Sequence, residues 1–247
     1  MADTDQNIER EVKLALGSKM EFARWREALR TPQYRLNQIN MYLRLADGEL
    51  KLGRYLLRVR ALCPDECQAE QCPLLTAAHD INGMTRFMSV CPLRRQLSKP
   101  FILTLKTAAK NVKNPLQAGY FQAQELEADI TPDQAIRVLQ GDLFSVANTQ
   151  PGRFLRELDI ESCAYQGAIL NTRLCYPRPN GEVWELDLSQ FSNGRCDAEL
   201  EIETEEPERV MAEVSDLAQR AGLPSYTKQE KTKYERFVEN LGENKKA

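Results

Sequence analysis

Alternation of apolar and polar residues is the dominant pattern along this chain. The segment "IEREVKLAL" at residues 8–16 places Glu9, Glu11 and Lys13 at every second position, with valine and leucine between them. Successive side chains of a strand point to opposite faces, so the segment predicts a strand with one apolar and one charged face.

The same alternation recurs along most of the chain and predicts eight or nine short antiparallel strands. Turn-forming residues at "DGEL", "PNG" and "SNG" separate several of these segments and predict hairpins. The further segments predicted as strands are 34–45, 50–60, 101–106, 120–130, 153–162, 168–176, 181–191 and 198–205.

Helical spacing of apolar residues predicts three or four helices. One begins near Ser18, and a short one follows Thr131 as N-cap with Pro132 at its first position. A third ends at Gly222, and the last crosses residues 228–241. The fold class is therefore α+β and mainly β.

Composition narrows the possible functions. The 247 residues are 42% hydrophobic and 28% charged with a net charge of −3, which is typical of a globular protein. The length fits one large domain or two small ones, and we expect a single domain spanning residues 1–247. No apolar run is long enough for a membrane span, and the polar N-terminus is unlike a secretion signal, so we expect a cytoplasmic protein. The net charge gives no sign of the basic surface that nucleic-acid-binding proteins carry, so no nucleic-acid partner is expected. The sequence leaves the oligomeric state open.

The composition of the charged faces is unusual for strands that simply face water. Acidic residues are depleted on ordinary strands, yet "AELEIE" carries Glu199, Glu201 and Glu203 in one row. Such a row is tolerable if a divalent cation lies between the carboxylates. A closed barrel with inward charged faces and helices over its outer apolar faces would satisfy this pattern, whereas a sheet with one wet side is the alternative.

The motifs resemble those of the CYTH superfamily, the triphosphate tunnel metalloenzymes. The opening Glu9-Arg10-Glu11-Val12-Lys13 matches the family's E-x-E-x-K, and the later motifs follow in family order. They are R-x-R at Arg58 and Arg60, the lysine of "LTLK" at Lys106, the arginine of "LNTR" at Arg173, Asp187 in "ELDLSQF", Glu199 and Glu201 in "AELEIE", and Lys233 in "TKYERF".

The resemblance implies an eight-stranded antiparallel closed β tunnel with flanking helices. Its members bind a triphosphate with Mg²⁺ or Mn²⁺ and hydrolyse it, or cyclise ATP. Guanidinium and ammonium groups suit phosphate oxygens, and carboxylates suit these metals. The implied phosphate ligands are Lys13, Arg58, Arg60, Lys106, Arg173 and Lys233. The implied metal ligands are Glu9, Glu11, Asp187, Glu199 and Glu201, and the implied catalytic residues are Lys13, Glu9 and Glu11.

Other roles remain open for several residues. Lys233 lies on a predicted helix, where a solvated face is the alternative. Glu127, Glu185 and Glu203 are expected to face solvent, lie at the tunnel mouth or pair locally. Trp25 and Trp184 are expected in the core.

Two departures from the family pattern leave the reaction open. Tyr42 is followed by Leu-Arg-Leu where members carry x-Asp-Thr, and Ala123 stands where many carry arginine. A triphosphatase acting on a small-molecule inorganic, nucleoside or thiamine triphosphate is the leading hypothesis. An adenylyl cyclase of the same family and a catalytically weak polyphosphate- or nucleotide-binding module are the alternatives.

A cysteine-rich segment at residues 61–100 interrupts the strand pattern and is predicted to be an insertion between two strands. It also contains His79, the one histidine of the chain. Four thiolates, Cys63, Cys67, Cys72 and Cys91, could bind an iron–sulfur cluster or a structural Zn²⁺. A loop with free or buried thiols is the alternative, and the other three cysteines are expected to be structural.

Overall fold

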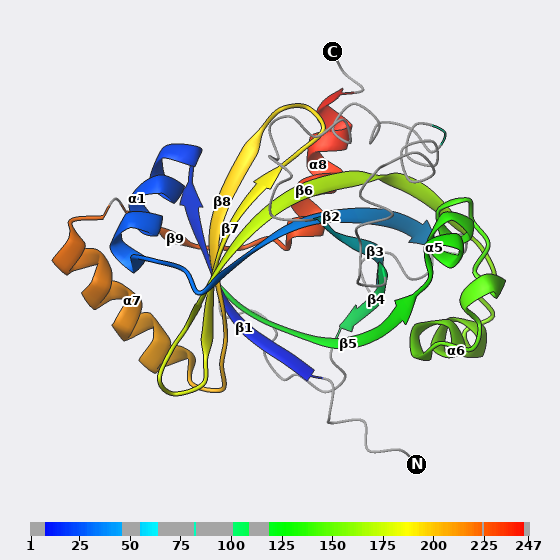
Figure 1. The fold of residues 1–247 in the computed structure, drawn as a ribbon, viewed down its shortest axis with the longest axis horizontal. Coiled ribbons are helices and arrows are strands. Elements are labelled where there is room, and N and C mark those ends of the chain that lie inside the picture. The colour runs from blue at the N-terminus through cyan, green and yellow to red at the C-terminus, as the bar shows by residue number, and fades with distance from the viewer. Residues whose placement is uncertain are drawn as a thin grey trace. The chain divides into compact units, whose positions relative to one another are not determined.

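The computed structural model describes residues 8–45, 55–63, 82, 101–108, 119–223 and 225–244 (Figure 1). Antiparallel β structure dominates these residues. The strands are β1 Ile8–Gly17, β2 Tyr34–Leu45, β3 Tyr55–Cys63, β4 Phe101–Ala108, β5 Tyr120–Ile130, β6 Cys163–Pro177, β7 Val183–Gln190, β8 Cys196–Glu203 and β9 Thr227–Lys228.

Helices connect or follow these strands. Within the described ranges there are five α-helices and one short 3₁₀ helix. They are α1 Lys19–Leu29, α5 Pro132–Leu139, the 3₁₀ helix η4 Phe144–Val146, α6 Gln150–Glu157, α7 Pro207–Ala221 and α8 Lys233–Asn244.

The strands form a closed antiparallel barrel. Their order is β5-β4-β3-β2-β6-β7-β8-β1-β9, and β5 also pairs with β1, so the first eight strands complete a ring. The two-residue β9 is added to β1. Closure leaves the eight main strands without an open edge, and the expected eight-stranded fold is confirmed.

The chain divides into two compact units, each with its own apolar core. The first comprises residues 1–7, 37–108 and 124–170, and the second comprises residues 8–36, 109–123 and 171–247. The boundaries fall inside β2, β5 and β6. Each unit is therefore built from several separate stretches of the chain.

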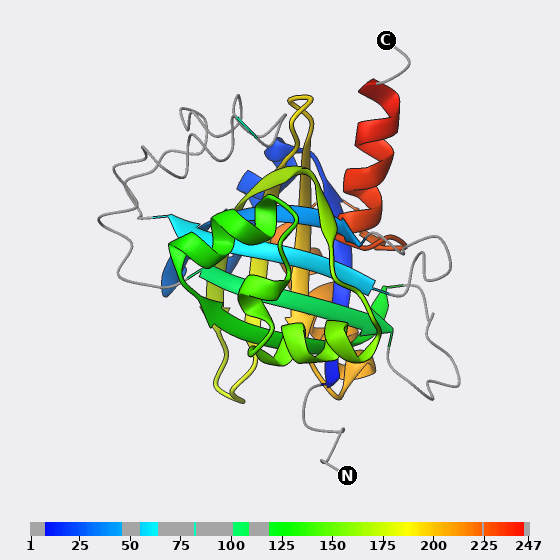
Figure 2. The same cartoon turned by 90° about the vertical axis from the view of Figure 1, so that its right-hand side faces the viewer.

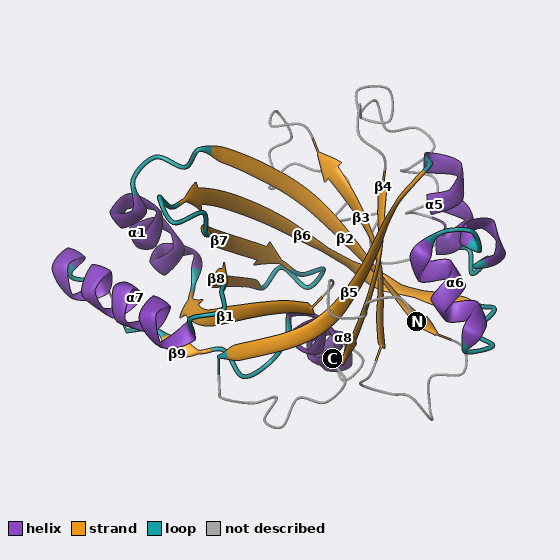
Figure 3. Cartoon of the chain, turned by 90° about the horizontal axis from the view of Figure 1, so that it is seen from below, coloured by secondary structure: helices purple, strands orange, loops and turns teal. Residues whose placement is uncertain are grey.

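Helices cover the apolar strand face in each unit. In the first unit α5 and α6 contact β4 (Figure 2), over a core that includes Leu103 and Leu126. In the second unit α1 contacts β7 and β8 while α7 contacts β1 (Figure 3). Trp25 and Trp184 are both fully buried there, which confirms the expectation that they are core residues.

The predicted helix ends are confirmed at three places. Ser18 and Thr131 each form a capping box. The side chain of each accepts a hydrogen bond from the helix backbone, and the side chain of a glutamate or glutamine three residues later accepts one from the backbone N–H of the capping residue. Gly222 ends α7 with a left-handed φ of 59°. The hairpin turns before and after β7 contain Gly181 and Gly194, whose φ values of 90° and 83° favour glycine.

The prediction of a strand at residues 153–162 was wrong, because α6 occupies Gln150–Glu157. The Thr149 side chain accepts a 3.1 Å hydrogen bond from the Gly152 N–H, and Pro151 lies in the first turn. Proline fits the first turn of a helix but cannot complete a strand ladder. This helix also explains why the described residues contain five α-helices rather than three or four.

The cysteine-rich segment is not tested by the structure. Cys67, Cys72, Cys91 and His79 lie outside the described residues, as does the predicted "DGEL" turn, and of Cys63 only the backbone at the end of β3 is described. The iron–sulfur or zinc site therefore stays a prediction. Among the described helices, none is both long and apolar enough to cross a membrane.

Candidate functional site

Three buried carboxylates gather on two neighbouring strands of the second unit. Asp187 on β7 faces Glu199 on β8 in the strand register, and Glu201 lies two residues further along β8. Each offers a carboxylate oxygen within 4.8 Å of the others. Their exposed fractions are 0%, 1% and 5%, so this carboxylate triad is almost fully removed from water.

Alternation along β7 and β8 explains why these acids share one face. Leu186, Leu200 and Ile202 occupy the intervening positions and are fully buried in the core beneath α1 and α7. The apolar face is fixed by this packing, so the acidic residues must point to the opposite face. A register slip of one residue would place leucine and isoleucine in the triad's positions.

Helix α8 brings two cations to the triad. The Lys233 Nζ lies 2.7 Å from Asp187 Oδ2 and 2.6 Å from Glu199 Oε1. One turn later, Arg236 donates to Glu199 Oε2 at 2.6 Å and to Asp197 Oδ2 at 3.0 Å. Lys233 therefore reaches the buried cluster rather than lying on a solvated helix face.

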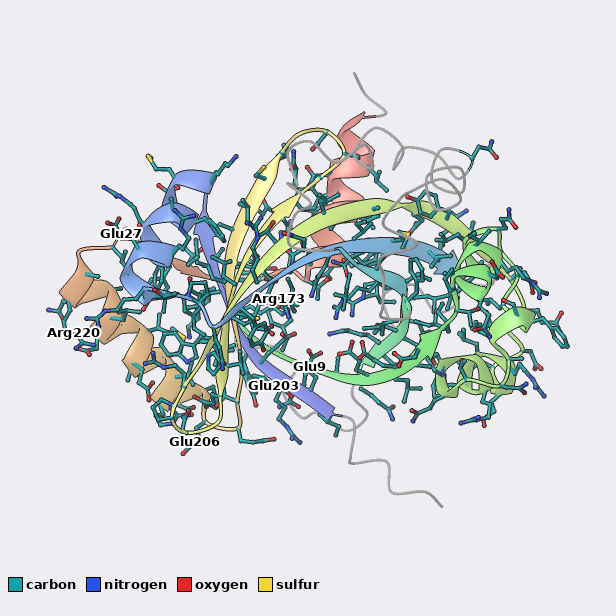
Figure 4. All side chains as sticks on the ribbon, in the orientation of Figure 1. Glu9, Glu27, Arg173, Glu203, Glu206 and Arg220 are labelled. Atoms are coloured by element: carbon teal, nitrogen blue, oxygen red, sulfur yellow. The ribbon has the colours of Figure 1, made fainter. Side chains whose placement is uncertain are left out.

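Arg173 (labelled in Figure 4) lies on β6, the strand that pairs with β7 on the side opposite β8. It donates to both Asp187 oxygens at 2.8 and 2.7 Å and to Glu201 Oε2 at 2.6 Å, and it also pairs with Glu185. This fork geometry is the strong form of an arginine–carboxylate interaction. The Arg173 side chain is largely buried, whereas the side chain of Arg220 on α7 is 70% exposed.

Lys13 approaches from β1, where it is the register partner of Glu201. Its Nζ lies 2.6 Å from Glu201 Oε1 and 2.9 Å from Glu11 Oε1, and it also lies over the Phe121 ring at 5.7 Å. Burial alone would lower the pKa of Lys13, but the surrounding glutamates outweigh it and hold the pKa well above its usual value. Lys13 is therefore a charged donor at neutral pH.

The pKa values within the cluster diverge according to local partners. Burial opposes ionisation of Asp187 and Glu201, yet Arg173, Lys233 and, for Glu201, Lys13 lower both pKa values. For Glu185 burial prevails over Arg173 and raises the pKa to about 7. Asp187 and Glu201 are consequently ionised, as a cation site requires.

The donor set of the triad fits Mg²⁺ or Mn²⁺. These ions prefer oxygen ligands, and three carboxylates offer such oxygens in a small buried volume. Acids also outnumber bases in the interacting cluster, so a divalent cation would offset the excess negative charge. The acids are Glu9, Glu11, Glu185, Asp187, Asp197, Glu199 and Glu201, and the bases are Lys13, Arg173, Lys233 and Arg236.

The first unit contains a charged network on its own strands β3, β4 and β5. Arg58 donates to Glu125 at 3.3 Å, and Lys106 pairs with the same carboxylate at 3.0 Å. Thr104 donates to Glu127 at 2.7 Å. Arg58 and Lys106, both predicted as phosphate ligands, thus share one acidic partner.

Arg60, the third cation predicted on this unit, donates from Nε to Asn40 Oδ1 at 3.1 Å. The local pairing of Glu127 and Glu185 agrees with expectation, and Glu203 is exposed on β8, next to the strand of Glu9 (Figure 4). The sequence reasoning did not include Arg236 or Glu185 among the site residues. Their signals were present: Arg236 lies one turn after Lys233, and Glu185 lies two residues before Asp187.

The barrel and its buried charges define a protein of the β-tunnel class. The sequence matches the CYTH domain over residues 7–236, so the chain belongs to the CYTH family. The family includes triphosphatases and adenylyl cyclases, and its tunnel enzymes use divalent metals. No curated protein matched the chain in a sequence comparison.

Solved structures that share the fold include two proteins described as candidate cyclases. One is a protein from Hippeastrum described as a candidate adenylyl cyclase with a dominant triphosphatase activity; it is 22% identical, with a TM-score of 0.70 and coverage of 94% of this chain and 96% of its own. The other is a candidate adenylate cyclase from Bacillus halodurans, 19% identical, with a TM-score of 0.57 and coverage of 94% and 99%. At these identities the likeness concerns the fold.

Proposed function

We propose that this protein is a divalent-metal-dependent triphosphatase. The substrate would be inorganic triphosphate or an organic triphosphate such as a nucleoside or thiamine triphosphate. The observation that carries the proposal is the carboxylate triad of Asp187, Glu199 and Glu201, buried in a CYTH domain with cations alongside it.

The triad and its neighbours have distinct proposed roles. Asp187, Glu199 and Glu201 would hold Mg²⁺ or Mn²⁺, with Glu9 and Glu11 as further ligands from β1. When bound, such an ion neutralises phosphate charge and makes a coordinated water a better nucleophile. The strand register sets the positions of these carboxylates, so the metal ligands are already in place before an ion binds.

The basic residues would bind and orient the phosphates. A triphosphate carries about four negative charges, and positioning with charge neutralisation accounts for most catalysis of phosphoryl transfer. Lys13 would act as a hydrogen-bond donor to phosphate or to the attacking water rather than as a base, because two carboxylates hold its proton. Arg173 and Lys233 would contribute further charge, and the phosphate ligands proposed from the first unit are Arg58, Arg60 and Lys106.

The proposed reaction is attack of water on the terminal phosphorus. A new phosphorus–oxygen bond forms, the bond to the bridging oxygen breaks, and that oxygen leaves with the diphosphate portion. The water loses its protons to the phosphate products and solvent. Orthophosphate is thus one product whichever triphosphate is used.

Phosphate release tests the proposal. We would measure it from tripolyphosphate and from ATP, with Mg²⁺ or Mn²⁺, for the natural protein, Glu199→Gln and a Glu9→Ala/Glu11→Ala protein. We expect metal-dependent release that falls at least a hundredfold in both variants. Glu203→Gln is the matched control because it removes a charge from the same strand at an exposed position.

Two other results would redirect the assignment. Both structural neighbours are described as candidate cyclases, so ATP products should be separated. Cyclic AMP with diphosphate would indicate attack of the ribose hydroxyl on the α-phosphorus, and the protein would be a cyclase. Tight triphosphate binding without turnover at saturating metal would indicate a binding module.

A further inference from the structure

Lys233 occupies the centre of the carboxylate triad. Its Nζ lies 2.7 Å from Asp187 Oδ2, 2.6 Å from Glu199 Oε1 and 3.5 Å from Glu201 Oε1. These three residues are the ones whose carboxylate oxygens lie within 4.8 Å of one another. The contact with Asp187 is a hydrogen bond, and those with Glu199 and Glu201 are ion pairs, so one ammonium charge faces all three carboxylates.

An ammonium and a metal ion cannot both occupy this position. The three carboxylates that would hold a divalent ion are the ones that the Lys233 Nζ already contacts. The two positive charges would also repel strongly in a buried site. Binding of the divalent ion by this triad therefore requires Lys233 to leave it.

We infer that Lys233 is an internal counterion, which fills the metal position in the metal-free protein and is displaced when a divalent cation binds. This inference rests on the proposed metal site. Lys233 supplies one positive charge where a divalent ion would supply two, so the ion offsets more of the excess negative charge of the acidic cluster. In the metal-free protein, Lys233 thereby reduces the repulsion among the three buried carboxylates.

The surrounding contacts allow this exchange without loss of α8. Lys233 is the first residue of the helix and has a flexible four-carbon stem. The helix has other attachments, since Arg236 donates to Asp197 and Glu199 and Asn193 donates to Asn240 at 3.0 Å. A side-chain rotation at Lys233 can therefore vacate the triad while the helix stays in place.

Displacement would give Lys233 a second role. Its ammonium, once released from the carboxylates, is available to an anionic oxygen of the substrate. Metal binding would thus fill the cation site and at the same time release the Lys233 ammonium to bind phosphate. The phosphate contact implied for this lysine would then depend on prior occupation of the metal site.

Metal affinity in the absence of substrate tests the inference. Mn²⁺ binding would be measured by calorimetry on EDTA-treated protein for the natural chain, Lys233→Met and Lys233→Arg. We expect Lys233→Met to bind Mn²⁺ at least tenfold more tightly, because the competing charge is gone and the apolar stem is kept. Lys233→Arg keeps the charge and should show no such gain.

Lys231→Met is the matched control. Lys231 lies two residues away and pairs with Glu239 at an exposed site, so its removal should leave Mn²⁺ affinity unchanged. Equal or weaker Mn²⁺ binding by Lys233→Met would overturn the counterion role while leaving the metal site intact. Absence of Mn²⁺ binding by every protein would overturn the proposed function and this inference together.

Thermal unfolding without and with Mn²⁺ gives a second readout that does not require a binding isotherm. Without metal, Lys233→Met should melt at a lower temperature than the natural chain, because three buried carboxylates have lost a counterion. Addition of Mn²⁺ should raise its melting temperature by more than it raises that of the natural chain. An equal or smaller rise would contradict the inference.

Discussion

Lys13 on β1 and Glu201 on β8 are register partners whose side chains form a buried ion pair of 2.6 Å. The pair connects the charged residues of β1, at the start of the chain, to the carboxylate triad near its end. Its burial means that loss of Lys13 leaves the charge of Glu201 only partly compensated away from water, because Arg173 and Lys233 remain as partners.

Breaking this pair should destabilise the metal-free protein. We expect Lys13→Met to lower the free energy of unfolding by about 3 kcal/mol, the size typical of a buried pair that loses one partner. Urea unfolding in EDTA measures it. Arg10→Met removes the exposed pair with Glu205 and should cost less than about 1 kcal/mol. Similar losses for the two variants would contradict the importance of burial.

Gly152 in α6 should not tolerate a side chain. A Cβ there would lie 2.0 Å from the Val146 carbonyl oxygen, and backbone cannot move aside as a flexible side chain can. We expect Gly152→Ala to unfold at a clearly lower temperature, with a loss of about 3 kcal/mol or more. Gly194→Ala is the comparison, since its Cβ meets nothing within 4 Å and only the φ of 83° opposes it. A smaller effect at Gly152 than at Gly194 would sink the argument.

Glu182 should make stability depend on pH. Burial raises its pKa, but hydrogen bonds from Asn180, Thr204 and Arg209 outweigh this and lower the pKa below its usual value. Because the folded-state pKa is depressed, the stabilisation is present above the unfolded-state pKa and is lost as pH falls through the folded-state pKa.

The stability difference between the natural chain and Glu182→Gln should therefore be largest at neutral pH and shrink in acid. Urea unfolding between pH 7 and pH 3 measures it, and Glu208→Gln serves as an exposed control on α7. A difference that stayed constant over this range would show that ionisation of Glu182 contributes nothing.

The cysteine hypothesis can be tested by elemental analysis. Anaerobically purified protein should contain iron or zinc, and Cys63→Ser/Cys72→Ser should lose it together with some stability. Burial raises the pKa of Cys163 to about 12 and that of Cys175 to about 11, so these thiols are poor ligands at neutral pH. Cys163→Ala should therefore leave metal content unchanged. Unchanged metal content and stability in the double variant would reject the cluster.

Strand alternation is a local property, so it predicted most of the strands and their charged faces. The eight-stranded closed tunnel was an expectation from the resemblance to the CYTH family, since closure depends on the pairing of the distant strands β1 and β5. Alternation failed at residues 153–162, where the spacing of Phe154, Leu155 and Leu158 also fits a helix and Pro151 decides between them. Sequence reasoning also could not assign partners. That Arg173 is shared by three carboxylates, or that Arg236 reaches Glu199, depends on contacts between distant segments that no local pattern encodes.

The interleaved make-up of the two units has a consequence for how such a protein can be divided or inherited. Boundaries fall within β2, β5 and β6, so each of these strands contributes residues to both units. No single cut in the chain would release either unit whole. Splitting the gene, or exchanging one unit between proteins, would interrupt strands within the hydrogen-bonded sheet. We therefore expect evolution to keep this domain as a single unit.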